Sequence, residues 1–272
     1  MFLTTTRMIA CISLMVSSVA LSANRIQTVT YEKNAEVFEG LLVSPENIKP
    51  QTPAILMIHS RMGVTAETQH QAERMANLGF IVFAADIYGR DSRPTTVEES
   101  RVLTTKYRSD RKLFRERLNL GLDILKQQEH VNTDMLFAVG YCFGGTGVLE
   151  LARSGADIVG VASFHGGLDS PTPDDGAQIQ AKVLVLHGAD DPTVSATNLA
   201  AFENEMRMHK VDWQLVKYGG TVHSFTDKSA GSDPSTGSAY NPVTDRRSFE
   251  AFKNFSAESL EQTPSQEPST GL

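Results

Sequence analysis

Short runs of consecutive apolar residues recur along the chain and alternate with longer segments in which apolar and charged residues are mixed. The apolar runs predict strands at residues 54–58, 80–85, 135–139, 158–164, 181–186 and 213–218. Three of these runs, residues 54–58, 80–85 and 135–139, contain no polar residue, so we expect both faces of these strands to be covered by other parts of the chain. Such strands are typical of a parallel sheet.

The segments between the apolar runs predict helices. The clearest is residues 111–127, in which leucines recur among charged residues, as in an amphipathic helix. Further helices are expected at residues 65–78, 144–154, 196–208 and 244–255, and residues 28–31 and 37–43 are expected to form an opening antiparallel pair. The alternation predicts an α/β fold with a mostly parallel central sheet and helices on both faces.

The two ends of the chain differ from the middle. Residues 1–23 contain one charge, Arg7, followed by a short apolar stretch with serines, which is typical of a cleaved signal peptide; a membrane anchor needs about 20 apolar residues. Residues 256–272 are too polar to bury a face and predict a disordered tail. We therefore expect one domain over residues 24–255, periplasmic or secreted, without a membrane anchor after cleavage.

The charge of the chain limits its partners. The formal net charge is −7, which gives no electrostatic support for nonspecific binding of nucleic acid or anionic lipid. Small molecules are the more suitable partners, and we expect a monomer without a nucleic-acid partner. Residues 90–106 are polar, contain Pro94 and lack clear periodicity, so they could either cover a site or form a solvated loop.

Cys142 is expected to be the one thiol of the mature protein, because Cys11 lies in the predicted signal peptide. It stands in the sequence Gly-Tyr-Cys-Phe-Gly-Gly, residues 140–145, between a predicted strand and a predicted helix. Glycines two residues before and two residues after it allow a tight turn, because neither has a Cβ that would clash. This setting favours a nucleophilic thiol over a buried structural cysteine, and a redox or intermolecular disulfide role stays open.

Candidate partners for such a thiol occur later in the chain. A nucleophile needs a base, a group that orients the base, and donors for the oxyanion that forms on a carbonyl. Asp190 and Asp191 follow one predicted strand, and His223 follows the last one. Because the carboxyl ends of parallel strands meet at one edge of a sheet, these loops can converge on Cys142. The order nucleophile, acid, histidine is that of hydrolases whose nucleophile stands on a sharp strand-to-helix turn.

Taken together, these motifs resemble the dienelactone hydrolase family. The similarity covers residues 36–255 and rests on the segments 86–90, 140–145, 164–168, 188–191, 223–226 and 239–241. The resemblance implies an α/β-hydrolase fold in which Cys142 is the nucleophile, His223 the base and Asp191 the orienting acid, with Asp190 as a solvated turn residue. It also implies a small ester or lactone as substrate and no cofactor.

The resemblance implies further roles. The backbone N–H groups of Phe143 and Arg61 would form the oxyanion hole. Arg90 matches an arginine with which the family holds a substrate carboxylate, and an ordinary surface arginine is the alternative. His165 and His187 each lie near glycine, so a packing or supporting role and a direct role in the chemistry are both open for them, and for His165 the direct role would be substrate binding. No pair of histidines has the spacing of a zinc site, so no metal is expected.

Two positions depart from the family pattern. Where dienelactone hydrolases typically carry a glutamate that interacts with the thiol, this chain has Ser60, which is expected to face the substrate. Where lactone-cleaving members have an arginine after the histidine, this chain has Thr226, Asp227 and Lys228, and an acid there would repel an anionic substrate. These departures favour a general carboxylesterase or thioesterase on neutral substrates, and a non-catalytic binding protein that keeps the fold is the further alternative.

Overall fold

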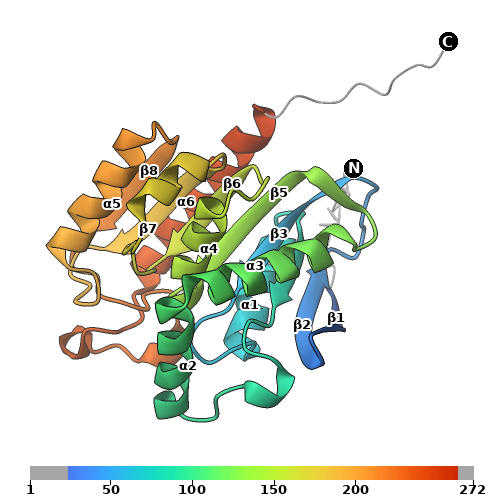
Figure 1. Ribbon diagram of the computed structural model, residues 1–272, viewed down its shortest axis with the longest axis horizontal. Helices are drawn as coiled ribbons and strands as arrows, with labels where there is room; N and C mark the ends of the chain where they lie inside the picture. The colour runs from blue at the N-terminus through green and yellow to red at the C-terminus, as the bar shows by residue number, and fades with distance from the viewer. Residues whose placement is uncertain (1–23, 263–272) are drawn as a thin grey trace, which may run out of the picture.

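The computed structural model describes residues 24–262 and arranges them around one eight-stranded sheet (Figure 1). The strands are β1 (Arg25–Lys33), β2 (Glu36–Ser44), β3 (Thr52–Ile58), β4 (Ile81–Ala85), β5 (Val131–Tyr141), β6 (Gly160–Phe164), β7 (Lys182–Gly188) and β8 (Trp213–Tyr218). Their order in the sheet is β1-β2-β4-β3-β5-β6-β7-β8. β2 is antiparallel to both of its neighbours, and all other neighbouring strands are parallel. The mostly parallel sheet predicted from the apolar runs is confirmed.

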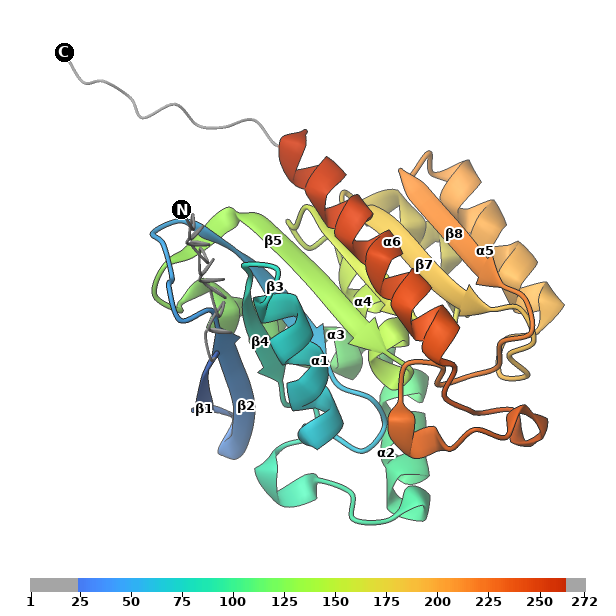
Figure 2. The same cartoon turned by 180° about the vertical axis from the view of Figure 1, so that it is seen from behind.

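Helices cover both faces of this sheet. They are α1 (Ala66–Ala76), α2 (Val97–Ser109), α3 (Arg111–Lys126), α4 (Phe143–Arg153), α5 (Ala196–Met208) and α6 (Pro242–Glu261). Figure 1 shows α3, α4 and α5 in front of the sheet, and Figure 2, from behind, shows α1 and α6 on the other face. The α/β fold with helices on both faces is therefore confirmed.

The core lies in two layers, one on each face of the sheet, and β3 contributes to both. Ala54, Leu56 and Ile58 belong to the layer with α3 and α4, whereas Ile55 and Met57 belong to the layer with α1 and α6. All five side chains are fully buried. Burial of an aliphatic side chain of this size stabilises a fold by about 1.5–3 kcal/mol. The continuous apolar run in this strand thus follows from its central position, where neither face meets water.

Two expected boundaries differ from the structure. Most of residues 90–106 lies in α2 and is not a loop; the helix begins with a capping box between Thr96 and Glu99 and buries only Ser100 and Tyr107, which explains its weak periodicity. α6 continues through Glu261, so the start expected for the tail falls inside this helix. The predicted signal peptide at residues 1–23 and the end of the predicted tail at residues 263–272 lie outside the described residues.

A buried ion-pair network holds α4 against its neighbours. Arg153, whose side chain is fully buried, bonds with Glu150 on the same helix and with both carboxylate oxygens of Glu205 on α5. Glu150 in turn pairs with Arg111 and Arg115 on α3. Breaking a buried pair leaves an uncompensated charge and costs about 3–5 kcal/mol. The network therefore fixes the helix at whose N-terminus Cys142 stands.

Candidate active site

Cys142 occupies a strained turn between β5 and α4. Its φ of 55° and ψ of −113° lie outside the regions that non-glycine residues ordinarily adopt, and such a conformation costs about 1–3 kcal/mol. The flanking glycines permit close approach of the backbone. A Cβ at Gly140 would lie 2.0 Å from the carbonyl oxygen of Gly144, and one at Gly144 would lie 2.1 Å from that of Ile58. Both glycines are required because the turn is pressed against its own helix and against β3.

The three residues predicted to act together meet in one hydrogen-bonded chain. His223 Nε2 lies 3.1 Å from Cys142 Sγ, and His223 Nδ1 lies 2.8 Å from Asp191 Oδ2. The other oxygen of Asp191 accepts hydrogen bonds from the backbone N–H and the hydroxyl of Thr193. Asp191 is buried, whereas Asp190 is exposed on the same turn. The sulfur, the imidazole and the carboxylate are thus aligned in the order that a thiol nucleophile, its base and an orienting acid require.

The surroundings of Cys142, His223 and Asp191 favour the ionised forms of these side chains. Burial by itself raises the pKa of Cys142, but the charge and hydrogen bond of His223, the N–H of Phe143 and the charge of Arg61 outweigh it, so the pKa is lowered. Burial lowers the pKa of His223, but Cys142 and Asp191 together raise it to about 10. Both shifts favour a thiolate beside an imidazolium. Burial also opposes ionisation of Asp191, yet its bonds to His223 and Thr193 leave its pKa below the ordinary value.

His165 holds the backbone of Cys142. Its Nδ1 accepts a hydrogen bond from the Cys142 N–H at 3.1 Å, so Nε2 carries the ring proton and donates to the Thr226 hydroxyl at 2.8 Å. Burial, followed by the charge of His223, keeps its pKa well below the ordinary value. His165 borders the cavity beside Cys142, but both of its ring nitrogens are occupied. This arrangement suits a supporting role for His165, and contact of His165 with a substrate stays a prediction.

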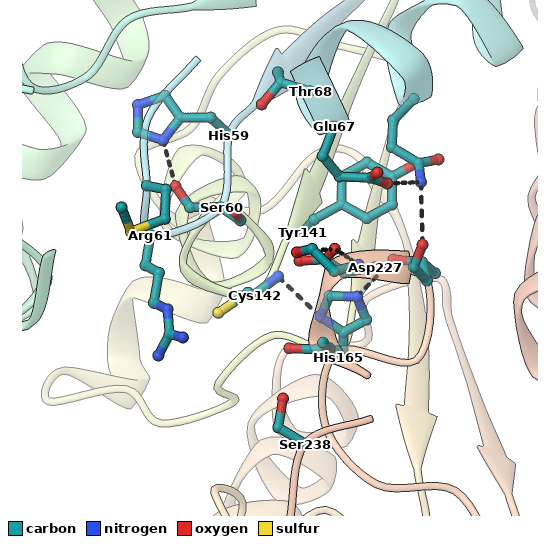
Figure 3. A pocket seen from close by; sticks show the side chains of 16 residues that line it. His59, Ser60, Arg61, Glu67, Thr68, Tyr141, Cys142, His165, Asp227 and Ser238 are labelled. Carbon is teal, nitrogen blue, oxygen red and sulfur yellow. Dashed lines mark hydrogen bonds between the residues drawn. The ribbon is translucent and has the colours of Figure 1, made fainter. Parts of the chain in front are cut away.

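A cavity of about 340 Å³ opens beside Cys142 (Figure 3). One wall is formed by the loop after β3, with Ser60 and Arg61, and another by the start of α1, with Glu67. Asp227 lines it from the loop that follows β8. Partial burial, together with the nearby charge of Asp227, raises the pKa of Glu67. The cavity is large enough for a small molecule, and it carries two acidic side chains and one basic one.

Comparisons with known proteins decide the family. Residues 38–260 match the model of the Dienelactone hydrolase family. The chain belongs to this family. Two solved structures, each 36% identical and covering 87% of this chain, are a protein named m3DLH, with a TM-score of 0.83 over 99% of its own length, and a dienelactone hydrolase-like promiscuous phosphotriesterase from metagenomic libraries, with 0.82 over 98%. The resemblance stated from the motifs is confirmed, as is the α/β-hydrolase fold.

Two curated relatives match shorter parts of this chain. An uncharacterized protein of Caenorhabditis elegans is 37% identical over 153 residues, which are 54% of this chain and 94% of that one. A probable 2-oxo-3-(5-oxofuran-2-ylidene)propanoate lactonase of Bradyrhizobium is 27% identical over 64% of this chain and 73% of its own length. Family membership supports a hydrolase, and the choice of substrate must come from the site itself.

In this dienelactone hydrolase family member, Arg90 does not reach the cavity. Its side chain is 43% exposed and its guanidinium pairs with Asp91 at 3.2 Å and with Glu39 at 3.6 Å. Arg90 is also absent from the residues that line the cavity, whereas Ser60 is among them. Arg90 thus lies outside the cavity in ion pairs, and its role in holding a substrate carboxylate stays a prediction.

Thr193 and Tyr141 are among the side chains of the site that the sequence did not indicate. Thr193 supports the far side of the Asp191 carboxylate, and its position two residues after an aspartate is the spacing of a local side chain–backbone turn. Tyr141 lines the cavity and is 6% exposed, and its hydroxyl has no hydrogen-bond partner among the residues that the structure describes. A buried hydroxyl in that position is available to a bound molecule.

Within residues 24–262, no group of three or more histidine, cysteine, aspartate or glutamate side chains is arranged to hold a metal ion. Likewise, none of the helices in this part of the chain combines the length and the apolar character that crossing a bilayer requires.

Proposed function

We propose that this dienelactone hydrolase family member cleaves carboxylic esters through a thioester formed on Cys142. The observation that carries the proposal is the contact of 3.1 Å between Cys142 Sγ and His223 Nε2, together with the lowered pKa of the thiol. A thiolate is the nucleophilic form of cysteine. The strained turn presents it at the edge of the cavity, where a substrate carbonyl can approach it.

The first half of the reaction would transfer the acyl group to the enzyme. The Cys142 thiolate attacks the carbonyl carbon, and the oxyanion accepts hydrogen bonds from the N–H groups of Phe143 and Arg61. The C–O bond to the leaving alcohol then breaks, and His223 Nε2 gives its proton to the departing oxygen. The alcohol, or for a lactone the ring-opened hydroxyl, is released, and Cys142 carries a thioester.

The second half would return the enzyme to its starting state. His223, now neutral, takes a proton from water, and the hydroxide attacks the thioester carbonyl. The C–S bond breaks, Cys142 leaves as a thiolate beside the imidazolium, and the acid is released. Asp191 keeps the Nδ1 proton of His223 in place throughout, so that Nε2 stays directed at the sulfur.

The charges of the cavity support neutral esters as substrates. Glu67 and Asp227 contribute two carboxylates to its walls against the single guanidinium of Arg61, and like charges at short range repel. The paired and exposed state of Arg90 removes the second cation that an anionic lactone would use. The names of the relatives add lactones and neutral phosphotriesters to the compounds worth testing.

The proposal is tested with purified protein and a series of aryl esters, thioesters, lactones and a neutral phosphotriester. Wild-type protein mixed with an activated ester and quenched in acid is expected to carry one acyl group on Cys142, detected by peptide mass. Cys142→Ala should lose both the acyl group and the turnover. Turnover that survives this substitution would exclude the cysteine mechanism.

A binding protein that keeps the fold is the competing function, and thiol reactivity separates the two. An activated Cys142 should react with iodoacetamide near neutral pH faster than free cysteine, and His223→Gln should remove that advantage. Labelling at the rate of a free thiol would support the binding function. We further propose export with removal of residues 1–23; the N-terminal sequence of the mature protein tests this.

A further inference from the structure

His59, at the end of β3, is buried and has both ring nitrogens engaged. Its Nε2 lies 3.2 Å from the backbone N–H of Ile87, and its Nδ1 lies 2.7 Å from the carbonyl oxygen of Ser60. A backbone N–H can only donate, so Nε2 is the acceptor and Nδ1 carries the proton. His59 is therefore a neutral imidazole whose single N–H is directed at the Ser60 carbonyl, as drawn in Figure 3.

This bond sets the orientation of the peptide between Ser60 and Arg61. The described residues contain no cis peptide bond, and in a trans peptide the C=O and N–H groups point in opposite directions. Holding the Ser60 carbonyl against His59 therefore turns the Arg61 N–H to the other side. The same carbonyl also accepts from the Gly63 N–H at 3.2 Å, and the next carbonyl, that of Arg61, accepts from the Tyr88 hydroxyl at 3.1 Å.

The His59 ring also touches the second part of the proposed oxyanion hole. It stacks on the ring of Phe143 with centroids 6.0 Å apart and meets the ring of Tyr88 edge-on at 4.7 Å, and Tyr88 in turn lies 5.5 Å from Phe143. One buried ring thus contacts both segments whose N–H groups would face the oxyanion. The hydrogen bonds of Cys142 and His223 do not themselves require the His59 ring to contact both segments.

We propose that His59 is a positioning residue of the oxyanion hole: its Nδ1–H holds the Ser60 carbonyl away from the reacting atoms and so directs the Arg61 N–H toward the oxyanion. Without this donor, the Ser60 carbonyl keeps only the hydrogen bond from the Gly63 N–H at 3.2 Å, and the peptide can rotate to present its carbonyl oxygen, which would repel the oxyanion. The inference rests on the proposed esterase function. The inference concerns the stabilisation of the oxyanion, which alkylation of the thiol does not require. Failure of the inference can therefore be distinguished from failure of the proposed function.

The test compares His59→Phe with wild type. Phenylalanine keeps the aromatic contacts and removes the donor. We expect kcat/KM for a neutral aryl ester to fall by about 10²- to 10³-fold, as for loss of one oxyanion donor, chiefly through kcat. The affinity of a trifluoromethyl ketone, which forms an oxyanion on the thiol, should fall in parallel. The rate of Cys142 alkylation by iodoacetamide should stay at the wild-type value, because that reaction forms no oxyanion.

Two further variants and one control complete the test. His59→Asn keeps a donor near the position of Nδ1 and should recover part of the lost kcat. Tyr88→Phe removes only the hydroxyl on the Arg61 carbonyl, and should show a smaller loss of the same kind, so the inference stays testable if His59→Phe does not fold. His209→Phe, at the C-terminal end of α5 and outside the residues that line the cavity, should leave all three measurements unchanged.

Each outcome has one meaning. Normal turnover in His59→Phe, with Cys142→Ala inactive, would overturn the inference and leave the proposed function intact. A parallel loss of turnover and alkylation would show that His59 supports the thiol or the fold and not the oxyanion. Turnover in Cys142→Ala would overturn both.

Discussion

Replacement of Asp191 by asparagine tests the central hydrogen-bonded chain most sharply. Asp191 accepts on both oxygens, from His223 on one and from Thr193 on the other. Asparagine has only one oxygen. If that oxygen faces His223, the NH2 group meets the N–H of Thr193, and two donors oppose each other. If it faces Thr193, the NH2 group donates to His223 Nδ1 and forces the ring proton onto Nε2.

The second orientation is favoured, because the Thr193 backbone N–H cannot turn away, and it disables the site. With its proton on Nε2, a neutral His223 cannot take the proton of Cys142, and the imidazolium also loses a neighbouring negative charge. We expect kcat/KM to fall by about 10²- to 10⁴-fold, the range for a triad with a misoriented histidine, which corresponds to about 3–5.5 kcal/mol. The pKa of His223, raised to about 10 in part by Asp191, should fall as well.

The assay is the pH dependence of Cys142 alkylation and of ester turnover in Asp191→Asn, with Asp190→Asn as the matched control. Asp190 is the exposed neighbour on the same turn, and its substitution should leave both measurements unchanged. The reasoning would be refuted if Asp191→Asn alkylated and turned over at the wild-type rate, or if the exposed Asp190 proved to be the sensitive position.

Three further measurements follow from the structure. The rate of ester turnover should have a bell-shaped dependence on pH. It should rise as Cys142 deprotonates, below the ordinary thiol pKa of 9.0, and fall near pH 10, because the imidazolium of His223 then loses the proton that the leaving group needs. A rate that stays constant well above pH 10 would contradict the ion pair. Arg153→Met should lower the free energy of unfolding in urea by about 3–5 kcal/mol, because it leaves the buried carboxylate of Glu205 unpaired and removes one of the three arginines that pair with Glu150. The exposed Arg101→Met should cost no more than about 1 kcal/mol, and equal effects of the two substitutions would show that burial does not set the cost. Glu67→Gln should raise kcat/KM for anionic esters relative to neutral ones by removing one carboxylate of the cavity, and an unchanged ratio would show that Glu67 does not face the substrate.

The sequence predicted the parts of the site that depend on strand ends. Cys142, Asp191 and His223 follow three parallel strands, and the topology alone brings the carboxyl ends of such strands to one edge. Their residue types were also visible, because a lone cysteine between glycines has few structural explanations. In each case the backbone determines where the side chain lies, so the sequence pattern was sufficient to predict that these three residues meet.

Side chains whose direction depends on distant partners were not predictable in this way. Arg90 fitted a motif, but Glu39 on β2 and its own neighbour Asp91 hold its guanidinium away from the cavity. Arg153 and Glu150 are fully buried because each finds a partner on another helix, and the sequence of α4 alone does not indicate this. Such pairings depend on the packed structure, and no local spacing indicates them.

The serine at position 60 has a consequence for how the thiol is kept reactive. In the family pattern, a glutamate at this place interacts with the sulfur, so that activation awaits the substrate. In this protein the thiol has its base and orienting acid without that glutamate, since His223 Nε2 lies 3.1 Å from the sulfur and Asp191 bonds with His223 Nδ1. We therefore infer that Cys142 is a thiolate in the resting enzyme, held by the imidazolium with support from the Phe143 N–H and the charge of Arg61. Because a thiolate is oxidised more readily than a thiol, dilute peroxide should inactivate the wild type, and Ser60→Glu should slow that inactivation; equal rates in the two proteins would argue against a preformed ion pair.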